Sequence, residues 1–248
     1  MFDKNSLFFE EVILFFAFLK KPKNYITSYK DCEYVINIYH FLRIKFEILL
    51  FWTIILWIIN IFLLGPISYN VAKIIGAHHK MEFVNIPIYI GILWAPLIEE
   101  MLFRYILLCN PIQFFVTLPF FVLLLLTGPS YYNLFLLFLL ILVCLYFRVR
   151  NSFSIAFNWN YYILYYQIIF YLSSILFAFI HVFNFSFNNN NKLNLLLIPL
   201  LLAPQLLSGL VLGWIRVSRG IFSSIIVHGL FNTGAILLIW FFSNKTCV

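Results

Sequence analysis

Long apolar runs constrain this chain more than any other feature of its sequence. Five runs, at 46–64, 86–108, 165–187, 193–215 and 221–242, contain very few charged side chains. Each is close to the ~20 residues that a helix needs to cross a hydrocarbon core about 30 Å thick. Two shorter runs, 112–126 and 134–147, are separated by turn-like residues around Gly128 and Pro129. We therefore predict an all-α, polytopic membrane helix bundle of about seven spans, within a range of six to eight.

Composition and charge support the same class of protein. The chain is 64% hydrophobic and only 10% charged, which lies far outside the range of soluble domains. With seven spans and an N-terminus in the cytoplasm, eleven of the 16 Lys and Arg residues fall on the cytoplasmic side. Cytoplasmic loops of membrane proteins carry such an excess. The net charge of +7 is then a topology signal, and no nucleic-acid partner is needed to explain it.

The first 45 residues differ from the rest in carrying mixed charge. Apolar residues from Phe8 to Leu19 recur at helical spacing beside Glu10 and Glu11. We predict a cytoplasmic or interfacial amphipathic lead-in at 1–45, followed by one transmembrane helical domain at 46–248. Within that domain, Gly209-x-x-x-Gly213 predicts a close contact between helices of the same chain.

Glu99 and Glu100 stand side by side inside an apolar run, and no acidic residue follows them. A carboxylate at bilayer depth costs at least ~2.5 kcal/mol, so an intramembrane pair marks a candidate functional site. Arg104 lies four residues after Glu100, which predicts an ion pair within one helix. Glu99 points off to one side and needs a partner on another helix. We therefore predict that Glu99 is a general base or proton shuttle.

Two other apolar runs carry the remaining polar candidates. His181 stands alone near the end of its run and is expected to help Glu99 orient a water molecule. His228 and Asn232 are four residues apart, so they share a helix face and are expected to donate jointly to a developing oxyanion. Each residue also has a structural interpretation: Glu100 and Arg104 as a buried ion pair, His181 as a core histidine, and His228 with Asn232 as interhelical hydrogen-bonding groups.

The three segments resemble the CAAX prenyl endopeptidase and bacteriocin-processing (CPBP) family of intramembrane proteases. The resemblance covers roughly residues 90–235. It rests on Glu-Glu-x-x-x-Arg at 99–104 after Ala95-Pro96, on the Phe177 to His181 segment, and on the region from Gly213 to Asn232. It implies an intramembrane endopeptidase in which Glu99 and His181 activate water, while His228 and Asn232 stabilise the oxyanion. Arg104 would hold Glu100 and the shape of the site.

The resemblance also bears on cofactors, partners and location. Glu99, His181 and His228 could hold a divalent metal such as zinc, and the same residues could activate water without one. The sequence therefore leaves open whether the site uses a metal ion. The expected partners are a membrane-associated peptide or protein substrate and the lipid bilayer, with the oligomeric state open. The segment after His181 lacks the additional histidine of eukaryotic CAAX-processing enzymes. We therefore expect a multi-pass protein of a bacterial plasma membrane and do not expect prenylated substrates.

Other classes of function remain as alternatives. A proton-coupled membrane transporter would use Glu99 as the proton carrier, and a catalytically inactive membrane scaffold would use none of these groups. No His-Glu-x-x-His, Gly-x-Ser-x-Gly or late aspartate occurs in the chain, which excludes the motifs of the other intramembrane protease chemistries.

Overall fold

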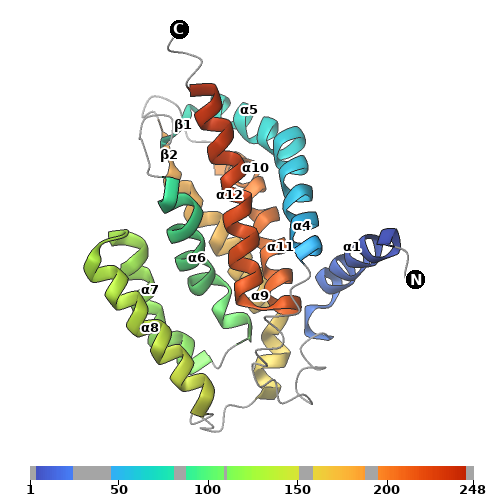
Figure 1. The fold of residues 1–248 in the computed structure, drawn as a ribbon. Coiled ribbons are helices and arrows are strands. Elements are labelled where there is room, and N and C mark those ends of the chain that lie inside the picture. The colour runs from blue at the N-terminus through green and yellow to red at the C-terminus, as the bar shows by residue number, and fades with distance from the viewer. Residues whose placement is uncertain are drawn as a thin grey trace.

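The computed structural model describes residues 4–24, 46–80, 88–108, 111–150, 159–187 and 195–243, and this part of the chain is mostly helical, as predicted (Figure 1). The α-helices are α1 (Lys4–Lys20), α4 (Phe46–Ile59), α5 (Gly65–Ile75), α6 (Ala95–Phe103), α7 (Pro111–Thr127), α8 (Tyr131–Arg150), α9 (Trp159–Ile180), α10 (Ile198–Leu201), α11 (Ala203–Arg219) and α12 (Ile221–Ser243). Two short strands, β1 (Ala77–His79) and β2 (Phe185–Phe187), complete the described fold.

Two π-helical turns precede α5 and α6, and in each case a proline is the second residue after the turn. In η1 (Asn60–Leu64) the N–H of Gly65 bonds to the carbonyl of Asn60, and Pro66 follows. In η3 (Ile90–Trp94) the N–H of Ala95 bonds to the carbonyl of Ile90, and Pro96 follows. Proline has no N–H and its ring crowds the carbonyl four residues earlier, so the helix widens by one residue at that point.

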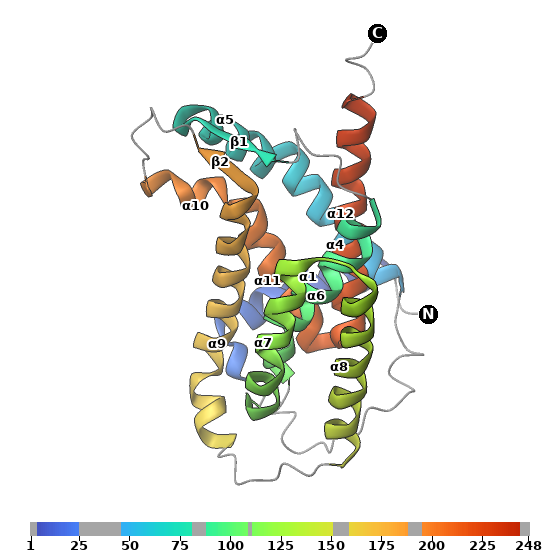
Figure 2. The ribbon, with the colours of Figure 1, turned by 90° about the vertical axis from the view of Figure 1, so that its left-hand side faces the viewer.

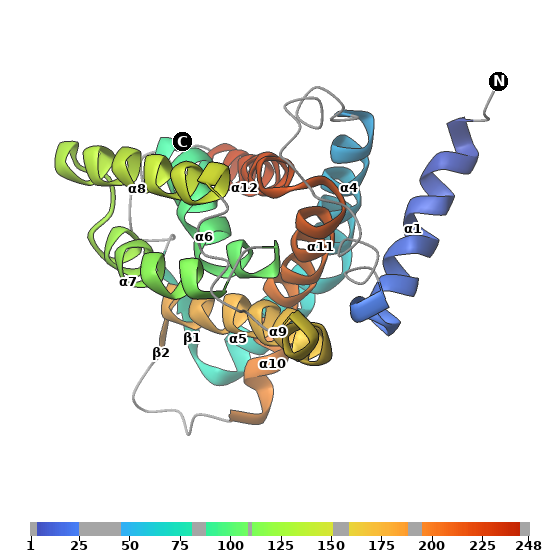
Figure 3. The ribbon, with the colours of Figure 1, turned by 90° about the horizontal axis from the view of Figure 1, so that it is seen from below.

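The main core lies between α4, α6, α9, α11 and α12, which lie next to one another when the bundle is viewed from below (Figure 3). Glycines bring α11 against α9. A Cβ on Gly209 would lie 3.2 Å from the backbone oxygen of Ser174, and one on Gly213 would lie 2.7 Å from the ring of Phe170. The predicted close contact at these glycines is therefore present within the chain.

A second, smaller core covers one end of the bundle. There α5, α10, β1 and β2 lie together above α9 and α11 (Figure 2). The strands pair antiparallel, with Ala77 opposite Phe187 and His79 opposite Phe185. This sheet was not predicted, and the expected helix at 165–187 ends instead at Ile180. The apolar run continues past the helix end because Phe185 is buried in the second core.

The N-terminal helix α1 packs against the bundle through aromatic side chains. Phe15 and Phe18 are buried, and the ring of Phe18 contacts those of Phe170 and Trp214. Glu11 also forms an ion pair with Arg219 at the end of α11. The helical part of the predicted lead-in is therefore docked on the bundle, while residues 25–45 lie outside the described part of the chain.

The predicted spans agree with the structure only in part. Among the described residues, two helices are long and apolar enough to cross a membrane, 46–75 and 164–184, and three shorter apolar helices occur at 114–127, 131–144 and 221–237. The run at 193–215 is interrupted, because Pro199 and Pro204 each begin a new helix and α11 starts only at Ala203. The run at 86–108 is helical only to Phe103 before a 3₁₀ turn at 105–108, and residues 86–87 are outside the described part.

Candidate functional site

The short helix α6 supplies three of the candidate residues. Pro96 stands in its first turn, Glu99 and Glu100 follow in its middle, and Arg104 is the residue at its C-terminal cap. Glu100 and Arg104 are both fully buried, whereas Glu99 is 15% exposed. A cation at a helix C-terminus interacts favourably with the unpaired carbonyl groups there. The sequence therefore places the positive charge of Arg104 one helical turn after Glu100.

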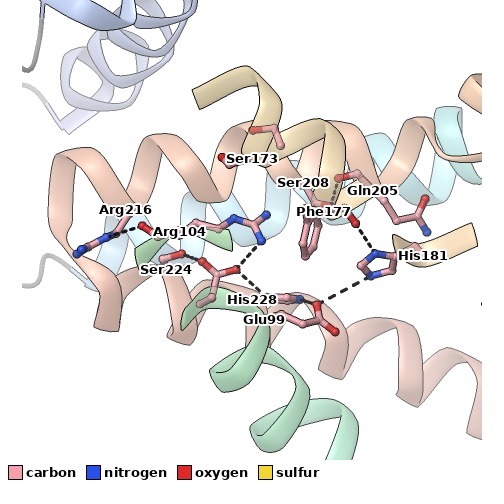
Figure 4. Close-up of polar contacts among 12 residues, drawn as sticks. Glu99, Arg104, Ser173, Phe177, His181, Gln205, Ser208, Arg216, Ser224 and His228 are labelled. Carbon is pink, nitrogen blue, oxygen red and sulfur yellow. Dashed lines mark hydrogen bonds and ion pairs between the residues drawn. The ribbon is translucent and has the colours of Figure 1, made fainter. Parts of the chain in front are cut away.

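Glu100 binds three donors. Nη1 of Arg104 lies 3.4 Å from Oε1 of Glu100, which is the predicted ion pair within α6. Nδ1 of His228, on α12, lies 2.9 Å from the same oxygen, and the hydroxyl of Ser224 donates to Oε2 (Figure 4). Two hydrogen bonds, from the imidazole and the hydroxyl, and the ion pair with the guanidinium together offset the cost of burying this carboxylate. Glu100 therefore holds the Nδ1 side of the His228 ring.

Glu99 faces two histidines from two other helices. Its Oε2 lies 3.7 Å from Nε2 of His228 and 4.0 Å from Nε2 of His181. The same oxygen is buried and has no hydrogen-bond partner within the described residues. The two distances exceed a direct hydrogen bond, and each is short enough for a water molecule to bridge the carboxylate oxygen and the imidazole nitrogen. The structure thus brings Glu99, His181 and His228 together, as the sequence predicted.

The hydrogen bonds on the far side of each imidazole ring fix which nitrogen faces Glu99. Nδ1 of His181 lies 2.7 Å from the carbonyl oxygen of Phe177, which can only accept, so that nitrogen carries a hydrogen. Nδ1 of His228 likewise carries a hydrogen toward Glu100. In the neutral form, the Nε2 atom of each ring then presents a lone pair. The carboxylate and two imidazoles are three acceptors around one point, and they require a shared proton or a donor between them.

The aromatic ring of Phe177 contacts Arg104 and both histidines. Its ring lies 3.7 Å from the guanidinium carbon of Arg104, close enough for a strong cation–π contact. The edges of His181 and His228 meet the same ring, with centroid distances of 4.7 and 5.6 Å. From the sequence, Phe177 was identified only as the start of a Phe-x-x-x-His segment, and its contact with Arg104 was not predicted.

Ser224 and Arg216 are further residues that sequence reasoning did not place at the site. Ser224 is buried four residues before His228, so the helical repeat was a signal that both share one face. Arg216, on α11, donates from Nε to the backbone oxygen of Arg104 at 3.1 Å. That carbonyl stands at the end of α6, and it also accepts from the backbone N–H of Leu107 in the 3₁₀ turn that follows. Arg216 therefore fixes the end of the helix that carries both glutamates.

Asn232 has a different environment from the one its spacing suggested. Its side-chain nitrogen donates to the carbonyl oxygen of Gly91 at 2.9 Å. This carbonyl belongs to the π-turn η3, and the residue five positions later, which would supply the π-type N–H, is Pro96. Asn232 thus satisfies a backbone acceptor that the proline leaves unpaired. It shares a face of α12 with His228 but contacts η3, whereas His228 contacts the two glutamates.

Close backbone contact holds α12 against η3 at this point. A Cβ on Gly229 would lie 2.8 Å from the backbone oxygen of Ile92. No larger residue fits there without moving one of the two elements. The hydrogen bond of Asn232 and the glycine contact together set the position of η3, from which α6 and Glu99 continue.

Glu99, His181 and His228 carry side chains of the kinds that bind metal ions. One carboxylate and two imidazoles are the ligand types of many catalytic zinc ions. Among the residues that the structure describes, however, no group of three or more His, Cys, Asp or Glu side chains is arranged to hold a metal ion.

Comparison with known proteins gives no relative for this chain. No protein-family model matches it, and neither a curated protein nor a solved structure shows a significant similarity.

Proposed function

We propose that the protein is an intramembrane endopeptidase of the glutamate-dependent type, with Glu99, His181 and His228 around the attacking water. The observation that carries this proposal is the convergence of two imidazole nitrogens on one buried carboxylate oxygen, at 3.7 and 4.0 Å. A water held between such acceptors is oriented for deprotonation, because each of its hydrogens points at a base. The resemblance of the three segments to CPBP proteases supports the same reaction class.

Charge balance indicates how the three acceptors share hydrogens. A water molecule brings two hydrogens for three acceptors, so one acceptor has to carry a proton of its own. His228 is the candidate, because its Nδ1 stands 2.9 Å from the second carboxylate, Glu100. The site then holds two carboxylates, the guanidinium of Arg104 and one imidazolium. The charges of these four side chains sum to zero, which lowers the cost of burying them.

This arrangement gives each residue a role in hydrolysis. The water donates to Glu99 and His181, and Glu99 takes a proton as the oxygen attacks the carbonyl carbon of the substrate. The imidazolium of His228, held by Glu100, donates from Nε2 to the oxyanion that forms. When the intermediate collapses, the C–N bond breaks and the proton on Glu99 passes to the leaving amine. Asn232 acts on the backbone before Glu99 and is a positioning residue in this scheme.

The molecular surface supports a location within the bilayer. Many large apolar side chains are exposed on α4, η1, α7 and α8, among them Phe62 at 76% and Leu126 at 79%. So much exposed apolar surface is unfavourable in water and favourable against lipid chains. We propose a multi-pass membrane protein with its N-terminus in the cytoplasm, in which the shorter apolar helices cross together with the two longer ones.

The proposal is tested by comparing membranes that contain wild-type protein with membranes that contain Glu99→Gln. Mass spectrometry of new peptide N-termini should find cleavage products that depend on Glu99. Glu10→Gln, at an exposed carboxylate of α1, is the matched control and should leave these products unchanged. Identical products from wild-type and Glu99→Gln membranes would contradict hydrolysis at this site.

The same geometry also fits a proton carrier, because a proton held by Glu99 lies within reach of two imidazoles. A proton-coupled transporter is therefore the second candidate. Purified protein in liposomes loaded with a pH-sensitive dye distinguishes the two. Proton flux that Glu99→Gln abolishes, with no Glu99-dependent proteolysis, would favour the transporter.

A further inference from the structure

A protease inside lipid has to present its substrate in an extended form. In a helix, each carbonyl of the substrate is bonded to an N–H four residues on, and the surrounding side chains shield it from attack. Unwinding exposes backbone groups, and each unpaired group costs several kcal/mol where no water is present. The enzyme therefore needs backbone donors and acceptors beside the reacting residues.

The two-stranded sheet lies directly beside the candidate site. His181 is the first residue of the 3₁₀ turn η5 (His181–Asn184), and β2 starts at the next residue, Phe185. Four residues at ~2 Å each place β2 roughly 8 Å from His181 along the chain. Three residues of an extended peptide cover roughly 10 Å. A peptide paired with β2 therefore reaches Glu99 within about three residues.

One edge of β2 has no partner among the described residues. β2 pairs with β1 in the register Ala77 to Phe187, and no third strand occurs in the described part of the chain. Figures 1 and 3 place β1 on the side of α5 and β2 on the outer side. An unpaired strand edge offers alternating N–H and carbonyl groups to an incoming peptide.

The side chains of β2 alternate in a way that suits an added strand. Phe185 is buried, Ser186 is exposed with its hydroxyl on the carbonyl of His78, and Phe187 is half-buried. A peptide that extends the sheet continues this alternation and places every second residue on the apolar face. In Figure 4, His181 stands between Glu99 and the turn that leads to β2.

We propose that the substrate binds as an extended strand on the outer edge of β2, which delivers its peptide bond to Glu99 and His181. This inference rests on the proposed endopeptidase function. It assigns the substrate class: membrane segments that unwind easily near the cleavage site, because they contain β-branched residues, Gly or Pro in place of strong helix formers. Such residues lower the helix propensity that has to be overcome.

Proline substitutions in β2 test the backbone contacts. Successive N–H groups of a strand point to opposite edges of that strand. Of the two variants Ser186→Pro and Phe187→Pro, one therefore removes an N–H that points to the outer edge, and the other removes an N–H that points to β1. For a substrate from the Glu99-dependent products, we expect the outward variant to lower kcat/KM about two- to tenfold without changing thermal stability. Ser186→Ala, which removes only the side chain, should leave kcat/KM close to the wild-type value.

A photo-crosslinking amino acid at Phe187, in the Glu99→Gln background that keeps substrate intact, locates the bound peptide. We expect crosslinks within about five residues of the cleavage site, and none from the same group at Phe179, an exposed residue of α9. Glu99-dependent cleavage with no crosslinks from Phe187 and no effect of either proline would overturn the strand-binding inference alone. Absence of any Glu99-dependent cleavage would overturn the proposed function itself.

Discussion

Replacing Arg104 with methionine tests whether charge balance holds the site together. Arg104 and Glu100 are both fully buried, 3.4 Å apart, and the arginine also stacks on Phe177. Methionine keeps much of the apolar side-chain volume but removes the guanidinium that pairs with Glu100. Breaking one partner of a buried ion pair costs about 3–5 kcal/mol, because the remaining charge stays desolvated. We therefore expect Arg104→Met to be among the most destabilising single substitutions in α6.

The assay is thermal unfolding in detergent, followed by tryptophan fluorescence. At about 2–4 °C per kcal/mol for a chain of this size, Arg104→Met should lower Tm by about 6–20 °C. Arg219→Met is the matched control, because Arg219 pairs with Glu11 where the two side chains are 17% and 10% exposed. Because the Arg219–Glu11 pair keeps some contact with solvent, removing Arg219 leaves a less desolvated charge, and Tm should fall by less than in Arg104→Met.

The double variant Arg104→Met with Glu100→Gln separates lost charge balance from lost packing. Glutamine keeps an acceptor for His228 and removes the uncompensated negative charge. We expect the double variant to recover most of the Tm that Arg104→Met loses. Equal Tm shifts for Arg104→Met and Arg219→Met, or a double variant no more stable than the single one, would refute the reasoning.

Three further predictions concern the walls of the site. Asn232→Leu leaves the carbonyl of Gly91 in the π-turn without its side-chain donor and should lower the free energy of unfolding by about 1–3 kcal/mol. In a Pro96→Ala background, which supplies the missing N–H, the same substitution should cost less, and a double-mutant cycle measures this difference. Gly229→Ala forces a Cβ to 2.8 Å from backbone and should cost about 1–3 kcal/mol, seen as a lower Tm. Phe177→Leu removes the ring under Arg104 and should cost more than Phe179→Leu at an exposed position; equal Tm values would contradict the cation–π contact.

Local spacing was enough to predict contacts within single helices. The pairing of Glu100 with Arg104 follows from a separation of four residues, and the structure shows it. The common face of His228 and Asn232 follows from the same rule. The apolar runs indicated the helices, because hydrophobic length and composition are properties of the sequence itself. Their ends were less accurate, since Pro199, Pro204 and the start of β2 interrupt runs that remain apolar.

The spacing of residues along the sequence did not show which roles the polar residues have through contacts between helices. The sequence indicated a shared site but did not show which residues of the other helices His228 and Asn232 contact. It could not show that Asn232 faces the carbonyl left unpaired before Pro96 while His228 bridges both glutamates. The two-stranded sheet could not be predicted either, because its paired residues are 106 to 110 positions apart in the chain and meet only after the helices have packed.

The amino-acid sequence by itself therefore determined that the chain is apolar, mostly helical and furnished with a few ionisable groups at helical spacing. Only the tertiary structure decided which of these groups meet. The physical reason is that a helix fixes the direction of a side chain about its own axis, whereas packing fixes the rotation of one helix against another. At this site that rotation is set by Gly229, Asn232 and the proline-induced π-turn, and it points Glu99 at two histidines.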